Sequence, residues 1–164
     1  MRIFLIGMPG SGKSTVGRKL SKALNYTFVD LDGMIEKDAL MFIDDIFEKY
    51  GEKKFRELET EALTKLPDGD LVVSCGGGIV TKKENKALMQ GLKVYLDTDL
   101  DQIRQRLEND YIRPLLKKKS LDQIYQERYL KYVDFADVMI SNDKSSEQTV
   151  QLILEHLQQR KDRT

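Results

Sequence analysis

Gly7-Met8-Pro9-Gly10-Ser11-Gly12-Lys13-Ser14 has the spacing of a P-loop, the glycine-rich turn that wraps the phosphates of a nucleotide. The apolar run Ile3–Ile6 before it predicts a short buried strand, and Lys13–Asn25 after it has apolar residues at helical spacing. The glycines therefore fall between a strand and a helix N-terminus, where backbone N–H groups and the helix dipole attract anions. The alternative is a glycine-rich turn that binds no nucleotide, and the strand–turn–helix context argues against it.

The motif assigns a role to two of its side chains. Lys13 is expected to reach the β- and γ-phosphates, and the Ser14 hydroxyl to be a ligand for one Mg²⁺ ion. We therefore expect a nucleoside triphosphate to bind here with its metal. The residues that surround the phosphates in this interpretation are Gly10, Ser11, Gly12, Lys13, Ser14 and Thr15.

Length and composition exclude several classes of protein. A chain of 164 residues is expected to form one domain, residues 1–164, with a sizeable core. Lys+Arg and Asp+Glu both number 27, which argues against a nucleic-acid binder that relies on neutralising phosphates. One cysteine, no secretory signal and no apolar run long enough to span a membrane predict a cytoplasmic protein. We expect a monomer whose partners are small molecules.

Strand and helix patterns alternate along the chain, which predicts an α/β fold with a parallel sheet covered by helices on both faces. Gly51 is expected to separate two helices, Ile43–Tyr50 and Glu52–Leu66. The other helices are expected at Lys13–Asn25, Lys83–Gln90, Leu100–Glu108, Asp122–Val133 and Ser146–Arg160. The expected strands are Ile3–Ile6, Thr27–Val29, Leu71–Ser74, Lys93–Leu96 and Val138–Ile140.

Unusual residues follow the ends of three of these strands. The P-loop follows the first strand, Asp30 and Asp32 follow the second, and Gly76-Gly77-Gly78 follow the third. Ligands of open α/β sheets bind beyond the carboxyl ends of the strands. These residues, distant in sequence, are therefore expected to meet at one edge of the sheet.

Asp30 and Asp32 are two residues apart, so their side chains would point the same way if the chain is still extended there. Beside a triphosphate, one carboxylate can hold the Mg²⁺ shell while the other orients an acceptor hydroxyl and takes its proton. The alternative is that one of them only caps a helix beginning near Gly33.

Gly76-Gly77-Gly78 cannot simply continue a strand, because three glycines pack nothing and lose much entropy. Such a run lets backbone approach a ligand closely, and the alternative is a tight turn into the next helix. Three arginines, Arg56, Arg113 and Arg128, are candidates to grip an anion, because a guanidinium group matches a carboxylate with two hydrogen bonds. Composition alone does not select these three from the other cations.

Taken together and in their order along the chain, these residues resemble those of the shikimate kinase family. The resemblance runs from Met1 to about Leu157 of this chain. That resemblance implies a five-stranded parallel sheet in the order 2-3-1-4-5, a substrate-binding region at about residues 31–62 and a lid at about 109–120. The matching residues are the P-loop with Ser14-Thr15 and Gly17, Asp30-Leu31-Asp32, Ile46-Phe47 with Gly51-Glu52, Phe55-Arg56-x-x-Glu59, Gly76-Gly77-Gly78, Tyr95-Leu96, Arg113-Pro114-Leu115-Leu116, Arg128-x-x-x-Tyr132 and Ala136-Asp137.

By the resemblance, the reaction is transfer of the γ-phosphoryl group of ATP to the 3-hydroxyl of shikimate, a step towards chorismate and the aromatic amino acids. The implied catalytic residues are Asp32 as the base, Lys13, and Arg113 as a lid arginine that swings over the phosphates. The implied shikimate-binding residues are Asp32, Arg56, Gly76, Gly77, Gly78 and Arg128. Arg106 is implied to lie near the adenine, and Ser14 and Asp30 to hold the Mg²⁺ shell.

The chain departs from the family pattern at Ser141-Asn142-Asp143-Lys144, which lacks a proline and an arginine often seen there. The sequence therefore does not say which residue contacts the base. This segment is also not the Asn-Lys-x-Asp pattern of guanine binders, which favours ATP over GTP. Two alternatives stay open: another small P-loop kinase, such as a gluconate kinase, and a non-catalytic ATP-binding switch.

Overall fold

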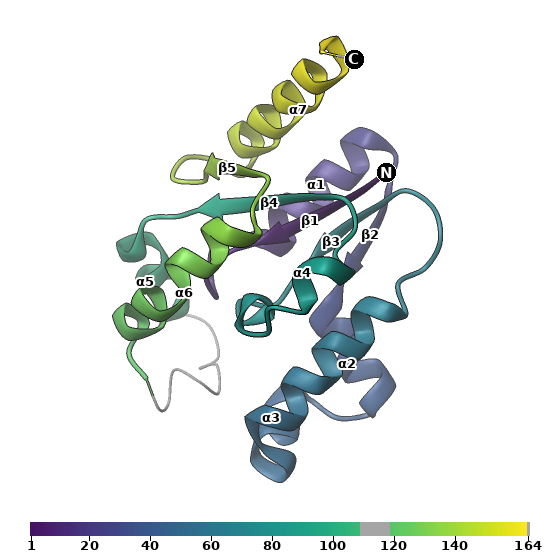
Figure 1. Cartoon of the computed structure of the whole chain (residues 1–164). Coiled ribbons are helices and arrows are strands. Elements are labelled where there is room, and N and C mark those ends of the chain that lie inside the picture. The colour runs from purple at the N-terminus through teal and green to yellow at the C-terminus, as the bar shows by residue number, and fades with distance from the viewer. Residues whose placement is uncertain (109–118, 164) are drawn as a thin grey trace.

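Five parallel strands form one sheet in the order β2-β3-β1-β4-β5 (Figure 1). The structure is a computed structural model, and it describes residues 1–108 and 119–163. All five strands predicted from the sequence are present, most of them longer by a residue at one or both ends. Their bounds are β1 Arg2–Ile6, β2 Thr27–Asp30, β3 Leu71–Ser74, β4 Leu92–Asp97 and β5 Val138–Ser141.

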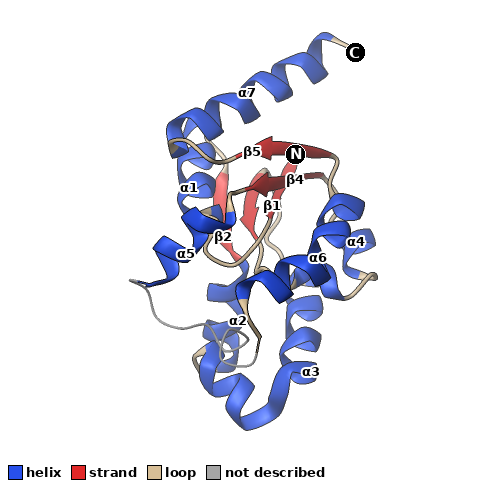
Figure 2. Ribbon diagram, turned by 90° about the vertical axis from the view of Figure 1, so that its left-hand side faces the viewer, coloured by secondary structure: helices blue, strands red, loops and turns tan. Residues whose placement is uncertain are grey.

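Helices cover both faces of the sheet, as the continuous apolar strands require (Figure 2). Because successive side chains of a strand point to opposite faces, β1 feeds two separate cores. Ile3 and Leu5 pack towards α1 (Lys13–Leu24) and α7 (Ser146–Asp162). Phe4 and Ile6 belong to the larger core on the other face.

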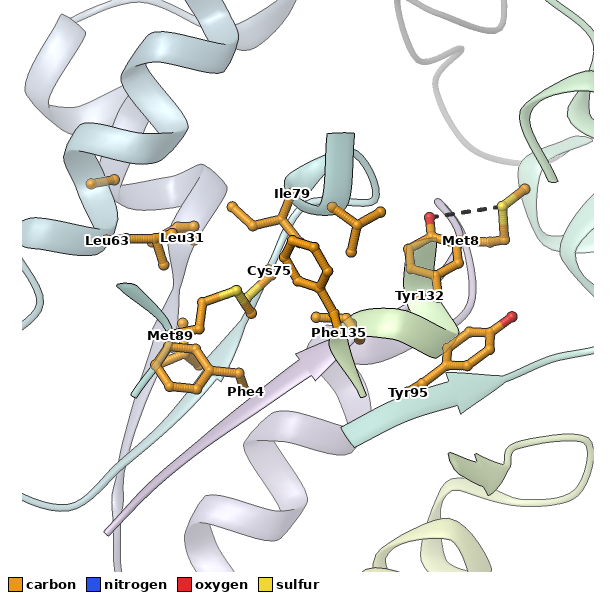
Figure 3. Close-up of a cluster of buried hydrophobic side chains, with 14 of the residues drawn as sticks. Phe4, Met8, Leu31, Leu63, Cys75, Ile79, Met89, Tyr95, Tyr132 and Phe135 are labelled. Atoms are coloured by element: carbon orange, nitrogen blue, oxygen red, sulfur yellow. Dashed lines mark hydrogen bonds between the residues drawn. The ribbon is translucent and has the colours of Figure 1, made fainter. Parts of the chain in front are cut away.

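The larger core holds the sheet against the helices that carry much of the candidate site (Figure 3). Tyr95 of β4 and Tyr132 of α6 (Leu121–Phe135) are almost fully buried and stack with ring centroids 5.0 Å apart. The Tyr132 hydroxyl also lies 3.9 Å from the sulfur of Met8, a residue of the P-loop. The core therefore connects α6 directly to the nucleotide-binding loop.

The segment after β2 folds back as a helical hairpin. α2 (Leu31–Ala39) begins directly after the strand, and α3 (Ile43–Thr64) follows it. The predicted break at Gly51 is confirmed, because Gly51 has φ 85° and ψ 172° and two helical parts meet there in a kink. The chain is not extended from Asp30 to Asp32, so the condition under which both side chains would point the same way is not met: Asp30 occupies the N-cap position and Asp32 lies in the first turn of α2.

The predicted helix Lys83–Gln90 is much shorter in the structure. A 3₁₀-helix η1 (Ile79–Thr81) and a single helical turn α4 (Asn85–Leu88) occupy this region. Met89 leaves the helical conformation with φ −87° and ψ 68°, and its side chain is fully buried. Burial of that side chain outweighs the helical propensity of the polar residues before it.

The last helices begin where the sequence supplies caps. α5 spans Leu100–Glu108 as predicted, and α6 and α7 each start with a capping box, formed by Ser120 with Gln123 and by Ser145 with Gln148. No helix in the described ranges 1–108 and 119–163 is both long and apolar enough to cross a membrane.

Candidate active site

A cavity of about 480 Å³ lies at the carboxyl ends of the first three strands. The P-loop, the start of α2 and the glycine run after β3 all contribute to it, so the predicted convergence at one sheet edge is confirmed. A neighbouring hollow shares Ser14, Asp30 and Asp32 with it and extends to the α2–α3 turn. The lining of the cavity is Pro9, Gly10, Gly12, Lys13, Ser14, Thr15, Val16, Asp30, Asp32, Ser74, Cys75, Gly76, Gly77, Arg106, Asn142 and Ser146.

The P-loop curls around its own lysine. Gly10 and Gly12 have φ angles of 77° and 89°, which side chains with a Cβ rarely adopt. The Lys13 ammonium donates to the carbonyl oxygens of Gly7 and Met8, both at 2.8 Å. A cation is therefore held within the turn of the loop, where phosphate oxygens can reach it.

A second cation reaches the loop from α5. Arg106 donates to the Gly10 carbonyl at 3.3 Å, and a Cβ on Gly12 would lie only 3.0 Å from its Nη1 atom. Arg106 thus lies beside the P-loop, and its implied position near the adenine stays a prediction. Arg113 and most of the predicted lid, 109–118, lie outside the described residues.

The side chains assigned to the metal lie together at the sheet edge. Ser14 Oγ and Ser74 Oγ are 3.2 Å apart, and Asp30 pairs with Ser74 in the register of β2 and β3. Asp30 makes no side-chain cap bond to α2, so helix capping does not occupy its carboxylate. Within residues 1–108 and 119–163, no group of three or more His, Cys, Asp or Glu side chains could hold a metal ion by itself.

The three consecutive glycines each make room for a different part of the site. A Cβ on Gly76 would lie 2.8 Å from Asp32 Oδ1 and 3.0 Å from Glu59 Oε2. A Cβ on Gly77 would meet Pro9 of the P-loop at 2.7 Å, and one on Gly78 would meet the Arg56 guanidinium at 2.3 Å. The glycine run therefore joins the nucleotide loop, the two carboxylates and an arginine within one turn of backbone.

Arg56 and Glu59 form a buried ion pair on α3. Arg56 Nη1 lies 2.7 Å from Glu59 Oε1, while Glu52 lies further from Nη2, at 3.4 Å. Glu59 is fully buried and Arg56 is 8% exposed. Burial raises the pKa of Glu59 from about 4.5 to about 7, although the charge of Arg56 and its hydrogen bond pull that pKa down.

Arg128 brings a second buried guanidinium from α6. It is 5% exposed, and its charge lowers the pKa of both Glu59 and Tyr132. The Tyr132 hydroxyl donates to the Gly77 carbonyl at 2.6 Å, and burial raises its pKa to about 12. Arg56 thus lies against the glycine run, and Arg128 interacts with Tyr132, which contacts Gly77, although neither arginine lines the 480 Å³ cavity.

Two site residues were given no role in the sequence analysis: Glu59, named only within the Phe55-Arg56-x-x-Glu59 match, and Ser74. Glu59 follows Phe55 by four residues and precedes Leu63 by four, so it lies on the buried stripe of α3. A carboxylate on such a stripe is a detectable signal of a paired, functional group. Ser74 carried no such signal, because a serine at the end of a buried strand is ordinary.

The chain is similar to known proteins in both sequence and structure. A sequence model described as shikimate kinase matches residues 9–158. The chain is 43% identical to the shikimate kinase of Sulfurihydrogenibium sp. over 164 residues, covering 96% of this chain and 98% of the relative. It is 44% identical to the shikimate kinase of Prochlorococcus marinus strain NATL2A, covering 95% of this chain and 82% of that one.

A solved structure is similar to this chain over almost its whole length. The shikimate kinase of Acinetobacter baumannii in complex with shikimate superposes with a TM-score of 0.91 at 34% sequence identity. The match covers 98% of this chain and 94% of that protein. Both the sheet order and the helices around the site are therefore shared with it.

Proposed function

Since the chain belongs to the shikimate kinase family, we propose that it transfers the γ-phosphoryl group of ATP to the 3-hydroxyl of shikimate, yielding shikimate 3-phosphate and ADP. The observation that carries the proposal is the glycine run Gly76–Gly78. It packs against the P-loop on one side and against Asp32, Glu59 and Arg56 on the other. A phosphoryl donor at the P-loop can therefore lie next to an acceptor that carries carboxylate and hydroxyl groups, because the same short run of backbone contacts both halves of the site.

The nucleotide side of the site positions the phosphates and balances their charge. Phosphoryl transfer through a loose transition state needs alignment and charge neutralisation more than covalent chemistry. Lys13, held in the loop, and the backbone N–H groups around Gly10–Ser14 supply positive potential there. Arg106 contacts the same loop from α5 and would flank the nucleotide.

The acceptor side orients shikimate for attack. Asp32 lines the cavity between the P-loop and Gly76, so its carboxylate can accept the proton of the attacking hydroxyl. Arg56 lies against Gly78, and Arg128 is the other buried guanidinium group of residues 1–108 and 119–163; the two would bind the shikimate carboxylate through paired hydrogen bonds. The backbone of Gly76–Gly78 would form the floor between them.

The residues at the sheet edge fit a Mg²⁺ ion that arrives with the nucleotide. Mg²⁺ usually takes one or two protein oxygens together with phosphates and water, rather than a complete protein cage. Ser14 and Asp30 would supply those oxygens, and Ser74 Oγ can accept the Ser14 proton, leaving a lone pair of Ser14 free to bind metal. When bound, the ion would neutralise charge on the β- and γ-phosphate oxygens.

Arg113 completes the proposal from its sequence motif alone. Arg113-Pro114-Leu115-Leu116 matches the family pattern of a lid arginine, which would add positive charge to the phosphates during transfer.

Release of ADP from Mg-ATP by the purified chain tests the proposal. Three reactions are compared, with shikimate, with gluconate and with no acceptor. We expect rapid release with shikimate only, accompanied by shikimate 3-phosphate in a product assay. Equal release with gluconate would favour another small P-loop kinase. ATP binding without acceptor-dependent release would favour a non-catalytic switch and overturn the proposal.

A further inference from the structure

Asn142 is a buried carboxamide that joins four parts of the chain. Its Nδ2 atom donates to the Ser11 carbonyl at 2.5 Å and to Thr98 Oγ1 at 3.1 Å, while its Oδ1 atom accepts from Thr149 Oγ1 at 2.6 Å. The side chain is 3% exposed, and its backbone N–H donates to the Asp97 carbonyl. A single amide thus connects the P-loop, the end of β4 and α7 to the segment directly after β5.

The partners fix which way round the amide lies. A carbonyl oxygen can only accept, so the Nδ2 end of Asn142 must face Ser11. Thr98 supports the same contact, because its hydroxyl lies 3.4 Å from the Ser11 carbonyl while accepting from Asn142. Both side chains therefore contact the same P-loop carbonyl.

Holding the Ser11 carbonyl also orients the next N–H group. A trans peptide is planar, so the Ser11 carbonyl and the Gly12 N–H point in opposite directions. Gly12 lines the cavity, and its φ of 89° is a backbone conformation that residues with a Cβ rarely adopt. With the carbonyl drawn towards Asn142, the N–H points to the side where the phosphates are expected.

We propose that Asn142 is a positioning residue for the nucleotide: it sets the orientation of the Ser11–Gly12 peptide and thereby aims a phosphate-binding N–H group. This role of Asn142 rests on the proposed function and deepens it, since it concerns the same nucleotide site. It does not depend on the identity of the acceptor.

Asn85 offers a matched control within the same molecule. It is also a buried carboxamide, 1% exposed, whose Nδ2 donates to the Ile79 carbonyl at 2.8 Å and whose Oδ1 accepts from Thr60 Oγ1 at 2.8 Å. Its bonds have the same chemistry as those of Asn142. They support the turn after Gly78, on the acceptor side, and touch nothing in the P-loop.

The experiment compares Asn142→Leu with Asn85→Leu, since leucine keeps the branched shape and removes both polar atoms. Both variants are expected to be less stable than the unmodified chain, and by a similar amount, because each removes an amide donor from a buried carbonyl. Calorimetric titration with ADP, without shikimate, then separates them. We expect Asn142→Leu to bind ADP about tenfold more weakly and Asn85→Leu to bind it within about twofold of the unmodified chain.

A second variant keeps the test decisive if Asn142→Leu folds poorly. Thr98→Val preserves shape, removes the other hydroxyl at the Ser11 carbonyl, and should weaken ADP binding about threefold. In steady state, both nucleotide-side variants should raise the KM for ATP and leave the KM for shikimate unchanged.

Unaltered ADP affinity in Asn142→Leu, or an equal loss in Asn85→Leu, would overturn the assignment. Normal ADP binding by a chain that does not phosphorylate shikimate would remove the proposed function and leave the role of Asn142 testable by the same titration.

Discussion

The nucleotide side and the acceptor side of the site are built in opposite ways. The nucleotide side is largely one continuous turn, Gly7–Ser14, whose backbone does most of the binding and whose lysine is held by its own carbonyls. The acceptor side is assembled from α2, α3, the turn after β3, and α6: Asp32 lies on α2, Arg56 and Glu59 on α3, and Arg128 on α6.

The difference lies in what holds each side in place. Backbone geometry specifies the loop, so its performance depends on a few glycine φ angles and on braces such as Arg106 and Asn142. The acceptor side depends on buried charges that must be paired across elements, which makes it sensitive to single side-chain changes and to pH. Substitutions on the acceptor side should therefore change turnover and shikimate binding while leaving nucleotide binding unchanged.

Asp32→Asn is expected to have the largest effect. Removing the proposed base should lower kcat about 10³-fold, while ADP binding stays near that of the unmodified chain. Asp38→Asn, an exposed change on the same helix, is the control and should leave kcat unchanged. A kcat for Asp32→Asn within a few-fold of the control would remove Asp32 as base and as positioning group.

Glu59→Gln tests the buried charge of the acceptor side through stability. The pKa of Glu59 is raised to about 7, so the folded chain holds this proton at pH values where the unfolded chain has already lost it. The stability that protonated Glu59 contributes to the folded chain is therefore fully present below about pH 4.5, and it is lost as the pH rises to about 7.

The measurement is urea unfolding of both proteins from pH 4 to pH 8. Between pH 4 and pH 8, the free energy of unfolding of the unmodified chain should fall by on the order of 3 kcal/mol relative to that of Glu59→Gln. A difference that grows in the opposite direction would mean that Arg56 outweighs burial and keeps Glu59 ionised.

Arg56→Lys sharpens the comparison between the two sides. Lysine keeps a positive charge beside Glu59 but cannot form the two parallel bonds of a guanidinium group. We expect the KM for shikimate to rise about 30-fold, with the KM for ATP unchanged. Arg104→Lys is the matched control, because Arg104 also makes a two-pronged contact, to Asp122 at 2.6 and 2.7 Å, on the exposed surface. Equal loss for both substrates in Arg56→Lys would point to a general disturbance of the fold.

Gly78→Ala should have the smallest effect of the four. The new methyl group would lie 2.3–2.5 Å from the Arg56 guanidinium, which must shift to make room. We expect shikimate to bind about tenfold more weakly and ADP to bind normally. Gly33→Ala is the control, since its methyl group would meet Asp30 at an ordinary 3.6 Å. Unchanged shikimate affinity would show that the position of Arg56 tolerates displacement.

Much of the fold could be predicted, because the strands are continuous apolar runs and the helices have clear caps or breaks. Gly51 and the serines before α6 and α7 act through local backbone chemistry, which is readable from neighbouring residues. The helix expected at Lys83–Gln90 failed for the opposite reason, since the burial of Met89 is a tertiary effect. The sequence also did not show that α2 begins directly after Asp30. Both Asp30 and Asp32 nevertheless line the cavity.

The sequence by itself determined the nucleotide loop, because a P-loop is a local backbone conformation whose glycines, lysine and serine are contiguous. It also indicated, through a family resemblance, which arginines and carboxylates to consider. Only the tertiary structure decided how these meet: that Gly76, Gly77 and Gly78 give room to three different partners, that Glu59 is buried against Arg56, and that Asn142 holds the Ser11 carbonyl. Those contacts join residues far apart in the chain, and their energies come from burial and pairing, which arise only once the elements have packed.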